Sequence, residues 1–578
     1  MQRTMKQARV IISGVQPALD AGRFPVKRTL GDTVVVTADI FAEGHDLLSA
    51  VLRYRQPDEV DWHEVSMTLQ GNDCWEACFT VSKLGYYVYT VQAWVDQFTT
   101  WYEALRKRVA ARQDVAVELL LGALLIEAAQ PCASAADVEL FQAWIGLLRA
   151  PQEKTGAVDT ASRLLEDETL VQRMSAAADR RDATMYPHEL AVLVDRERAR
   201  FSTWYEMFPR SSSPIPGQHG TFKDCEARLP AIAQMGFDVL YLPPIHPIGE
   251  VHRKGKDNAL LAGPDDPGSP WAIGAATGGH MAIHPQLGTL AEFRHLVARA
   301  QDHGLEIALD IAFQCAPDHP YVQEHPEWFR WRPDGTVQYA ETPPKKYEDI
   351  LPFEFGSTAW RSLWEELKRV VCFWMEQGVR VFRVDNPHTK PLRFWEWLIS
   401  ECKALHPEVL FLAEAFTRPK VMYYLAKLGF TQSYSYFTWR NTKRELEDYF
   451  TDLTATDVCE YFRPNLLATT PDILHAYLQA GGPAAFRVRL ILAATLGATY
   501  GIYSGFELCE NTAVPGREEY LHSEKYEIKV RDWNADGSIK DFITRVNLAR
   551  RENPALQLFA SLTFLEIDHD QLIAYVKS

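Results

Sequence analysis

Three patterns of hydrophobic and polar positions follow one another along the 578 residues. In the first hundred residues, apolar and polar positions alternate between Gly and Asp turns, most clearly at 33–38, 50–54 and 86–95. Alternation with period two is typical of strands that have one buried face. An immunoglobulin-like β-sandwich over residues 1–105 is the simplest fold for this region.

Residues 106–185 instead place apolar residues at helical spacing, with few residues that break helices. The helices that this pattern predicts span 114–130, 134–150 and 168–181. Strand-like sequence returns at 190–194 and 200–208, so we expect a helical bundle inserted into a sandwich that residues 186–208 complete. A spacer and an interface for a second subunit explain such a bundle equally well.

After a linker at residues 209–220, strand-like and helical segments alternate up to about residue 553. Strands are expected at 238–243, 307–311, 381–385, 410–413, 430–436, 466–469 and 499–503. This count predicts a multidomain α/β chain with a (β/α)₈ TIM barrel over 209–555 and a lid subdomain at about 315–357. Residues 556–578 resemble the first two strands of a further β domain, which we expect to be truncated.

Composition excludes several classes of protein. Hydrophobic residues make up 47% and charged residues 24%, as in a globular protein, and neither a membrane span nor a signal peptide is predicted. The net charge of −16, with no compensating basic tract, argues against a nucleic-acid partner. Nine scattered cysteines indicate free thiols in a reducing cytoplasm, and the sequence contains no evident metal or cofactor motif.

The first candidate chemistry lies at the end of the strand predicted at 381–385. Arg383 and Asp385 are two residues apart, so both side chains lie on one face at the carboxyl end of the strand. In a parallel barrel this is the edge where catalytic residues gather. A structural ion pair is the alternative explanation for this pair alone.

Three carboxylates follow at what we expect to be successive barrel-strand ends, namely Asp385, Glu414 and Asp472. Two carboxyl groups in close proximity perform retaining glycosyl transfer, one as nucleophile and one as acid/base. A third can stabilise the positive charge that develops at the anomeric carbon. The set therefore favours chemistry on a sugar over a purely structural role.

Asp310, Arg383, Asp385, Glu414 and Asp472, in this order, resemble the conserved regions of the α-amylase superfamily, glycoside hydrolase family 13. Longer motifs at 253–258, 312–320, 343–347, 378–391 and 523–526 are similar to one branch of it, the maltosyltransferases that extend α-glucans from maltose 1-phosphate. The resemblance covers almost the whole chain. It implies a cytoplasmic glycosyltransferase without a cofactor, a maltose 1-phosphate donor, an α-1,4-glucan acceptor and a homodimer formed by the N-terminal domains.

The resemblance also implies a role for individual residues. Asp385 would be the nucleophile, Glu414 the acid/base, Asp472 the transition-state stabiliser and Arg383 the residue that orients Asp385. Contacts to the donor would come from Lys254, Asn258, Gln314, Asp349, Asn386, Lys525 and Tyr526. The phosphate would meet Thr342, Lys345 and Tyr347, whereas Lys346 fits a solvated lid face better.

Some positions depart from the amylase pattern. Gln314, Cys315 and Pro471 stand where amylases have residues of the sugar-binding histidine motifs, and the maltosyltransferases share these substitutions. Thr342 replaces an Asn that is usual in the maltosyltransferases, which predicts an altered phosphate pocket. Four aromatic residues could stack on acceptor sugars or simply pack in the fold: Trp328, Trp331, Tyr436 and Trp439.

Two other functions remain compatible with the sequence. The chain could be another retaining α-glucan enzyme of the superfamily, either a hydrolase or an isomerase. It could also be a non-catalytic glucan-binding homologue.

Overall fold

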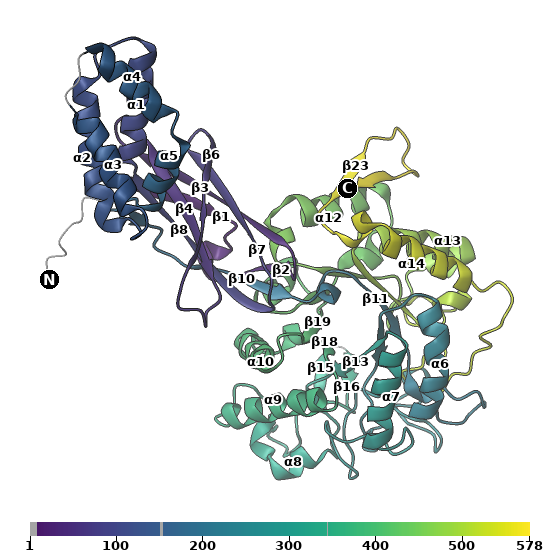
Figure 1. Cartoon of the computed structure of the whole chain (residues 1–578). Helices are drawn as coiled ribbons and strands as arrows, with labels where there is room; N and C mark the ends of the chain where they lie inside the picture. Colours follow the sequence, from purple (N-terminus) through teal and green to yellow (C-terminus); the bar gives the residue numbers. More distant parts are fainter. Residues whose placement is uncertain (1–8, 151–153, 344) are drawn as a thin grey trace. The chain divides into compact units, whose positions relative to one another are not determined.

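The computed structural model describes residues 9–150, 154–343 and 345–578, with the side chains of 154, 155 and 345 left out of the description. The chain divides into two compact units, Met1–Val194 and Asp195–Ser578 (Figure 1). Each unit has its own hydrophobic core, and each is described separately below.

The part of the first unit that the structure describes contains two antiparallel sheets. The first has the order β1 (Val10–Gln16), β3 (Thr33–Ala42), β7 (Cys74–Thr80) and β6 (Thr68–Gly71). The second has the order β2 (Val26–Thr29), β10 (Leu190–Asp195), β8 (Gly85–Val95), β4 (Leu48–Arg55) and β5 (His63–Ser66), with β9 (Thr184–Met185) beside β8. Every second residue of β3 is buried, and β3 contacts both β4 and β8, so the sheets enclose a sandwich core.

The described residues between β8 and β9 form five α-helices. They are α1 (Gln97–Ala110), α2 (Ala116–Ala129), α3 (Val138–Arg149), α4 (Lys154–Leu165) and α5 (Glu168–Ala176). Their buried residues form one apolar cluster that includes Trp101 and Phe141. A side chain at Gly122 would place a Cβ only 2.1 Å from the Trp101 ring, so glycine lets α1 and α2 approach closely.

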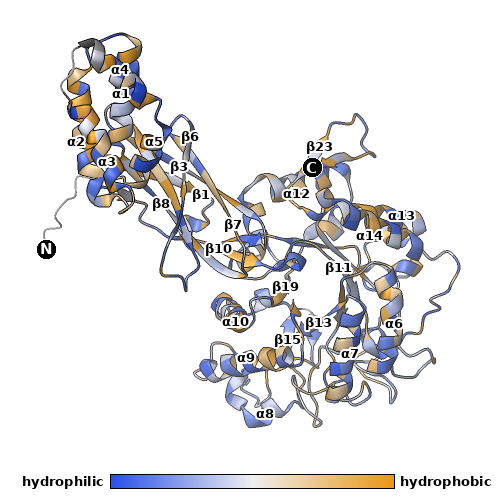
Figure 2. Ribbon diagram, in the orientation of Figure 1, coloured by the Kyte–Doolittle hydropathy of each residue, from blue (hydrophilic) through white to orange (hydrophobic). Residues whose placement is uncertain are grey.

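Helix α2 is apolar on two faces. Leu119, Ala123 and Ile126 point into the helical cluster. A second stripe at helical spacing is exposed, and its residues are Val117, Leu120, Leu121 and Leu124. Figure 2 accordingly shows α2 as one of the most hydrophobic helices of the chain.

The second unit is built on a closed barrel of parallel strands. Its order is β11 (Ser202–Glu206), β12 (Val239–Leu242), β13 (Glu306–Ile311), β18 (Val381–Asp385), β19 (Leu410–Glu414), β20 (Gln432–Tyr434), β21 (Pro464–Leu467) and β22 (Thr499–Tyr503). All but β11 correspond to strands expected from the sequence. The barrel fold is therefore confirmed.

The assignment of β11 to the sandwich is wrong. This strand pairs in parallel with β12 and β22, and its pairing closes the barrel. All five of its residues are buried, as expected for a strand covered on both faces rather than for a half-exposed sandwich strand. The division between the two units accordingly falls at residues 194 and 195 instead of 208 and 209.

Helices follow the barrel strands in the chain, and all but the last of them connect one strand to the next. They are α6 (Phe222–Gln234), α7 (Leu290–Asp302), α9 (Trp360–Glu376), α10 (Leu392–Leu405), α11 (Pro419–Lys427), α12 (Lys443–Ala455), α13 (Ala476–Leu496) and α14 (Lys540–Glu552). Capping boxes fix the starts of α6, α7 and α12, where a Thr side chain and an acidic residue three positions later bond each other's backbone N–H groups. Among the described residues, no helix is long and apolar enough to cross a membrane.

The segment between β13 and β18 forms small elements beside the barrel. Near the two ends of this segment, β14 (Gln314–Cys315) pairs with β17 (Leu351–Pro352). Between them in the chain, β15 (Ala340–Thr342) pairs with β16 (Lys345–Tyr347). Helix α8 (Pro320–Glu324) lies between β14 and β15 in the chain. At the other end of the unit, β23 (Leu562–Leu565) and β24 (Ala574–Lys577) form a separate hairpin sheet.

Candidate active site

The ends of β18 and β19 bring two of the predicted carboxylates together. The strands are parallel, and Asp385 stands directly opposite Glu414 in their register. One strand further round the barrel, Asp310 on β13 stands opposite Arg383. All four side chains are at least largely buried at the carboxyl edge of the barrel.

Arg383 is the centre of this group. One of its terminal nitrogens, Nη1, donates to Asp310 Oδ2 at 2.9 Å and to Asp385 Oδ1 at 2.8 Å. The other, Nη2, lies 3.2 Å from Glu414 Oε1. Because the guanidinium has a rigid planar fork, these contacts fix the positions of the carboxylates as well as balancing their charge.

Asn386 joins the two facing carboxylates from the other side. It has a left-handed backbone conformation, with φ 44° and ψ 52°. In this conformation its backbone N–H donates to Glu414 Oε2 at 3.1 Å, and its side-chain Nδ2 donates to Asp385 Oδ2 at 3.4 Å. A non-glycine residue adopts this conformation at a cost, so the turn is one that the surrounding structure must hold.

The facing carboxylates have opposite electrostatic environments. Burial and the negative charges of Asp385 and Asp472 raise the pKa of Glu414 to about 8, even though Arg383 opposes this shift. Burial also acts to raise the pKa of Asp385, but the charges of Arg383 and Lys390 outweigh it and hold that pKa below its usual range. At neutral pH, one carboxyl is therefore protonated and its neighbour is ionised.

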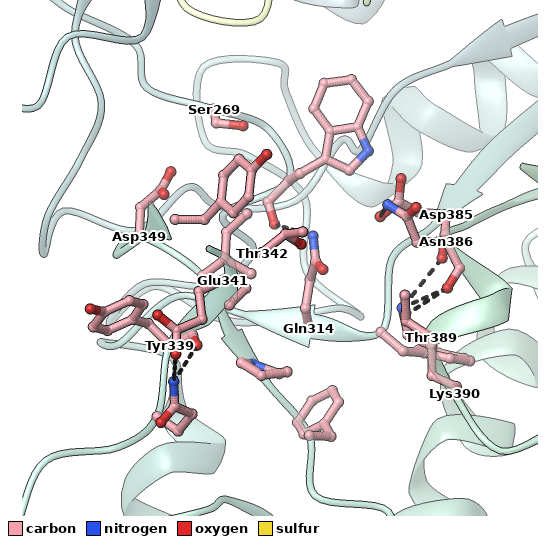
Figure 3. Close-up of a pocket in the computed structure, with 18 of the residues that line it drawn as sticks. Ser269, Gln314, Tyr339, Glu341, Thr342, Asp349, Asp385, Asn386, Thr389 and Lys390 are labelled. Carbon is pink, nitrogen blue, oxygen red and sulfur yellow. Dashed lines mark hydrogen bonds between the residues drawn. The ribbon is translucent and has the colours of Figure 1, made fainter. Parts of the chain in front are cut away.

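A cavity of about 760 Å³ opens over these residues (Figure 3). Its wall includes Asp385, Glu414 and Asp472, so the three acids line one cavity. They do not follow successive strands, as the sequence suggested: Asp472 lies beyond the end of β21, and β20 separates it from β19. The carboxylate of Asp472 accepts a hydrogen bond from Lys525 Nζ at 2.5 Å.

Nearly all the predicted donor contacts line the same cavity. They are Lys254, Asn258, Gln314, Thr342, Tyr347, Asp349, Asn386, Lys525 and Tyr526. Figure 3 shows Asp385, Asn386 and Lys390 on one side and Asp349 on the other. Arg383 lies beneath the wall, and the side chain of Lys345 lies outside the described part of the chain.

Within this wall, cations are held next to acids. Lys254 is 3% exposed, and its Nζ donates to Glu348 Oε2 at 2.9 Å. The buried Asp349 lies close to Lys254, and burial raises the pKa of this carboxyl. Such groups can bind sugar hydroxyls as donors and acceptors.

Sequence reasoning missed several residues of the cavity wall, and Trp271 and Lys390 are the two with contacts to the charged groups of the site. Trp271 donates its indole N–H to Asp310 Oδ2 at 3.2 Å, and the Lys525 ammonium lies 5.2 Å from its ring centre. It belongs to a long loop with no recognisable pattern. Lys390 bonds the backbone carbonyls of Asp385 and Asn386. It lies within the motif 378–391, so its position in the chain was a usable signal.

The four aromatic residues considered for acceptor stacking are not among the residues that line the described cavity. Trp328 is buried, stacks on His325 at 3.8 Å and donates to Ser362. Trp439 donates to Glu518 at 3.1 Å. These contacts favour the packing explanation.

Within the described residues, Asp257, His522 and Glu527 are the group that could together hold a metal ion, with ligand atoms within 4.8 Å of one another. The His522 ring lies 3.4 Å from Glu527, and its backbone N–H donates to Asp257 at 2.9 Å. These contacts account for the group as ion pairs and hydrogen bonds on a surface that is mostly exposed.

Comparison with solved structures identifies the class of fold. An α-amylase from Lactobacillus plantarum matches 66% of this chain and 87% of its own, with a TM-score of 0.52 and 23% identity. An α-glucosyl transfer enzyme matches 66% of this chain and 88% of its own, with a TM-score of 0.52 and 18% identity. These matches show that the chain shares the fold of these enzymes.

Comparison with curated proteins identifies the family. Alpha-1,4-glucan:maltose-1-phosphate maltosyltransferase from Chlorobaculum tepidum is 54% identical over 98% of this chain and 85% of its own length. The enzyme of the same name from Myxococcus xanthus is 52% identical over 99% of this chain and 87% of its own. Residues 8–196 match the model of the N/S domain of these maltosyltransferases. The chain belongs to the α-1,4-glucan:maltose-1-phosphate maltosyltransferase family.

Proposed function

We propose that this chain transfers a maltosyl unit from α-maltose 1-phosphate to the non-reducing end of an α-1,4-glucan and releases inorganic phosphate. Membership of the family supports the substrates and the reaction. The observation that carries the mechanism is the pair Asp385 and Glu414, which face each other in one cavity with their pKa values shifted in opposite directions.

The reaction is a retaining double displacement. The ionised Asp385 attacks the anomeric carbon, and the bond from that carbon to the phosphate oxygen breaks as a β-maltosyl ester forms. Glu414 gives its proton to the departing phosphate. It then accepts the proton of the acceptor's 4-hydroxyl, whose oxygen attacks the anomeric carbon and releases Asp385.

Two further residues support this chemistry. Arg383 donates to Oδ1 of Asp385, which orients the carboxylate and favours its charged form. Asp472 stabilises the positive charge at the anomeric carbon, and its contact with Lys525 fixes its position. The roles of Arg383 and Asp472 stay predictions.

The part of the cavity wall that β15 and β16 contribute, called here the donor side, suits the charged leaving group of α-maltose 1-phosphate. Thr342 and Tyr347 offer hydroxyl donors from the paired strands β15 and β16, and Lys345 stands opposite Thr342 in their register. A phosphate needs donors and positive charge of this kind. Lys254, Asn258, Gln314 and Asp349, with Asn386, Lys525 and Tyr526, are proposed to bind the two sugars.

The exposed stripe of α2 supports the predicted homodimer. Val117, Leu120, Leu121 and Leu124 are 45–67% exposed on a helix whose opposite face is already buried. A helix that is apolar all round normally has both faces covered. A second copy that presents the same stripe would cover it with two-fold symmetry. The cytoplasmic location inferred from the cysteines stays a prediction.

The test is to incubate the protein with α-maltose 1-phosphate and glycogen while measuring phosphate and chain length. The proposed transferase releases one phosphate for each maltosyl unit by which the glucan grows. Release of free maltose with the phosphate would instead identify a hydrolase, and a rearranged disaccharide an isomerase. No turnover by a protein that binds glycogen would identify a glucan-binding homologue. Asp385→Ala is the control for contaminating activity.

A further inference from the structure

Lys390 occupies a position that the proposed mechanism does not yet use. It follows Asp385 by five residues and lines the cavity. Its Nζ lies 3.4 Å from the backbone oxygen of Asp385 and 3.3 Å from that of Asn386, as the dashed lines in Figure 3 show. An ammonium group has three donors, so both carbonyls can be bonded at once.

These two carbonyls belong to the turn after β18, in which Asn386 hydrogen-bonds both the nucleophile and the acid/base. Thr389 also donates to the Asn386 oxygen, from its hydroxyl at 2.8 Å and from its backbone N–H at 3.1 Å. The turn is left-handed at Asn386, which is why that residue can reach both Glu414 and Asp385. Loss of the Lys390 contacts would let the turn relax and would loosen both reacting groups.

The charge of Lys390 is also placed differently from that of the other cations in the wall. Lys254 pairs with Glu348, Lys525 with Asp472, and Arg330 with Glu354. The two contacts described for Lys390 are to neutral carbonyl oxygens, so its charge acts on the carboxylates nearby. Charged and titratable groups surround Asp385. They are Arg383 on its own strand, His388 and Lys390 in the turn, Asp310 on β13, Glu414 on β19, and Asp472 and Lys525 from later loops.

We propose that Lys390 is a positioning residue of the transfer reaction. Through the carbonyls of Asp385 and Asn386 it holds the left-handed turn that aligns nucleophile and acid/base, and its ammonium favours the ionised nucleophile. The inference rests on the proposed function of the site. It predicts an effect on the chemical step and on its pH dependence, in contrast to an effect on donor binding.

The test compares Lys390→Met with Lys390→Arg in the full chain, using phosphate release from α-maltose 1-phosphate with glycogen. We expect Lys390→Met to lower kcat ~10–100-fold with a donor KM within ~3-fold of the original. The acidic limb of its kcat/KM profile should move to higher pH, because Asp385 loses a neighbouring positive charge. Lys390→Arg keeps the charge, so it should restore the original limb and most of kcat.

Lys420→Met is the matched control. This exposed lysine follows Glu414 by six residues on the next strand–helix unit, and its loss should change neither kcat nor the limb. An unshifted acidic limb in Lys390→Met, or an effect confined to KM, would overturn the inference. Should that variant not fold, Lys390→Gln decides by the same criterion, since it keeps a donor without the charge. An unaltered protein that releases no phosphate would refute the proposed function instead.

Discussion

Two regions of the molecule break the usual distribution of residues in opposite directions. At the carboxyl edge of the barrel, Arg383 and Asp385 are charged yet only 5% and 6% exposed. On α2, Leu120 and Leu124 are apolar yet 50% and 55% exposed. Buried charges need partners, and exposed apolar stripes need a cover.

The partners of the buried charges and the cover of the apolar stripe have different sources. The barrel supplies partners from within the second unit, since Arg383 contacts three carboxylates and Asn386 links two of them. The stripe on α2 lies opposite the face that already packs in the helical cluster. The first departure therefore points to chemistry performed by one chain, and the second points to association between chains.

The largest expected effect is the loss of activity in Asp385→Asn. The amide is nearly the same size but cannot form the ester, so phosphate release should fall by at least ~10,000-fold. The fold should persist, because Arg383 retains its contact with Asp310. Phosphate assays beside a thermal melt check this. Substantial residual turnover would mean that the buried acid of the barrel edge is structural.

The second effect concerns the other region, where Leu120→Glu with Leu124→Glu should separate the proposed homodimer. Each leucine buried in an interface contributes ~1.5–3 kcal/mol, so the dissociation constant should rise at least ~100-fold. Analytical ultracentrifugation measures this directly. Leu405→Glu, on the exposed face of α10, is the matched control. An unaltered molar mass in the double variant would argue that α2 is not the interface.

The third effect is a loss of kcat/KM at alkaline pH. Glu414 must be protonated to assist the departing phosphate, and its pKa is raised to about 8. Activity should therefore persist through neutrality and fall as pH rises through about 8, by tenfold per further unit. A pH–rate profile tests this, with enzyme returned to neutral pH as the control for denaturation. A limb near the ordinary carboxyl value would contradict the assignment of Glu414.

The smallest effect is expected at Thr342, which lines the donor side of the cavity. Thr342→Asn provides a hydrogen-bond donor with a longer reach, so the KM for α-maltose 1-phosphate should fall by a few-fold while kcat changes little. A change of this size corresponds to roughly one hydrogen bond to a charged group or less. Initial rates at varied α-maltose 1-phosphate measure it. Asn258→Ala, which removes another residue of the cavity wall, provides a comparison in which the donor KM should rise. An unchanged KM would remove Thr342 from the phosphate pocket.

Much of the fold was predictable because its signals are local. Buried runs such as Val381–Asp385 depend only on neighbours in the chain. The same holds for helix N-termini at which a Thr is followed three residues later by an acidic residue. The assignment that failed, β11, is a five-residue strand adjoining the sandwich sequence. Its parallel pairing with β12 and with β22, the latter almost three hundred residues later in the chain, assigns it to the barrel.

The site divides in the same way. The spacing of Arg383 and Asp385 places both side chains on one face of a strand. The expected strand ends suggested Glu414 and Asp472 as their partners, and the resemblance added a role for each. The contact of Trp271 with Asp310 could not be predicted, because it depends on how a distant loop returns to the barrel edge. Lys390 lies within the motif, but its bonds to the turn depend on the left-handed backbone at Asn386, which the sequence did not indicate.

The sequence by itself determined the chemical groups and their local order, since backbone geometry fixes which side chains share a strand face. The tertiary structure decided what those groups can do. Closure of the barrel sets Asp385 opposite Glu414, and burial with unequal neighbours separates their pKa values. Desolvation and the distance between charges are properties of the packed fold, and a linear chain does not contain them.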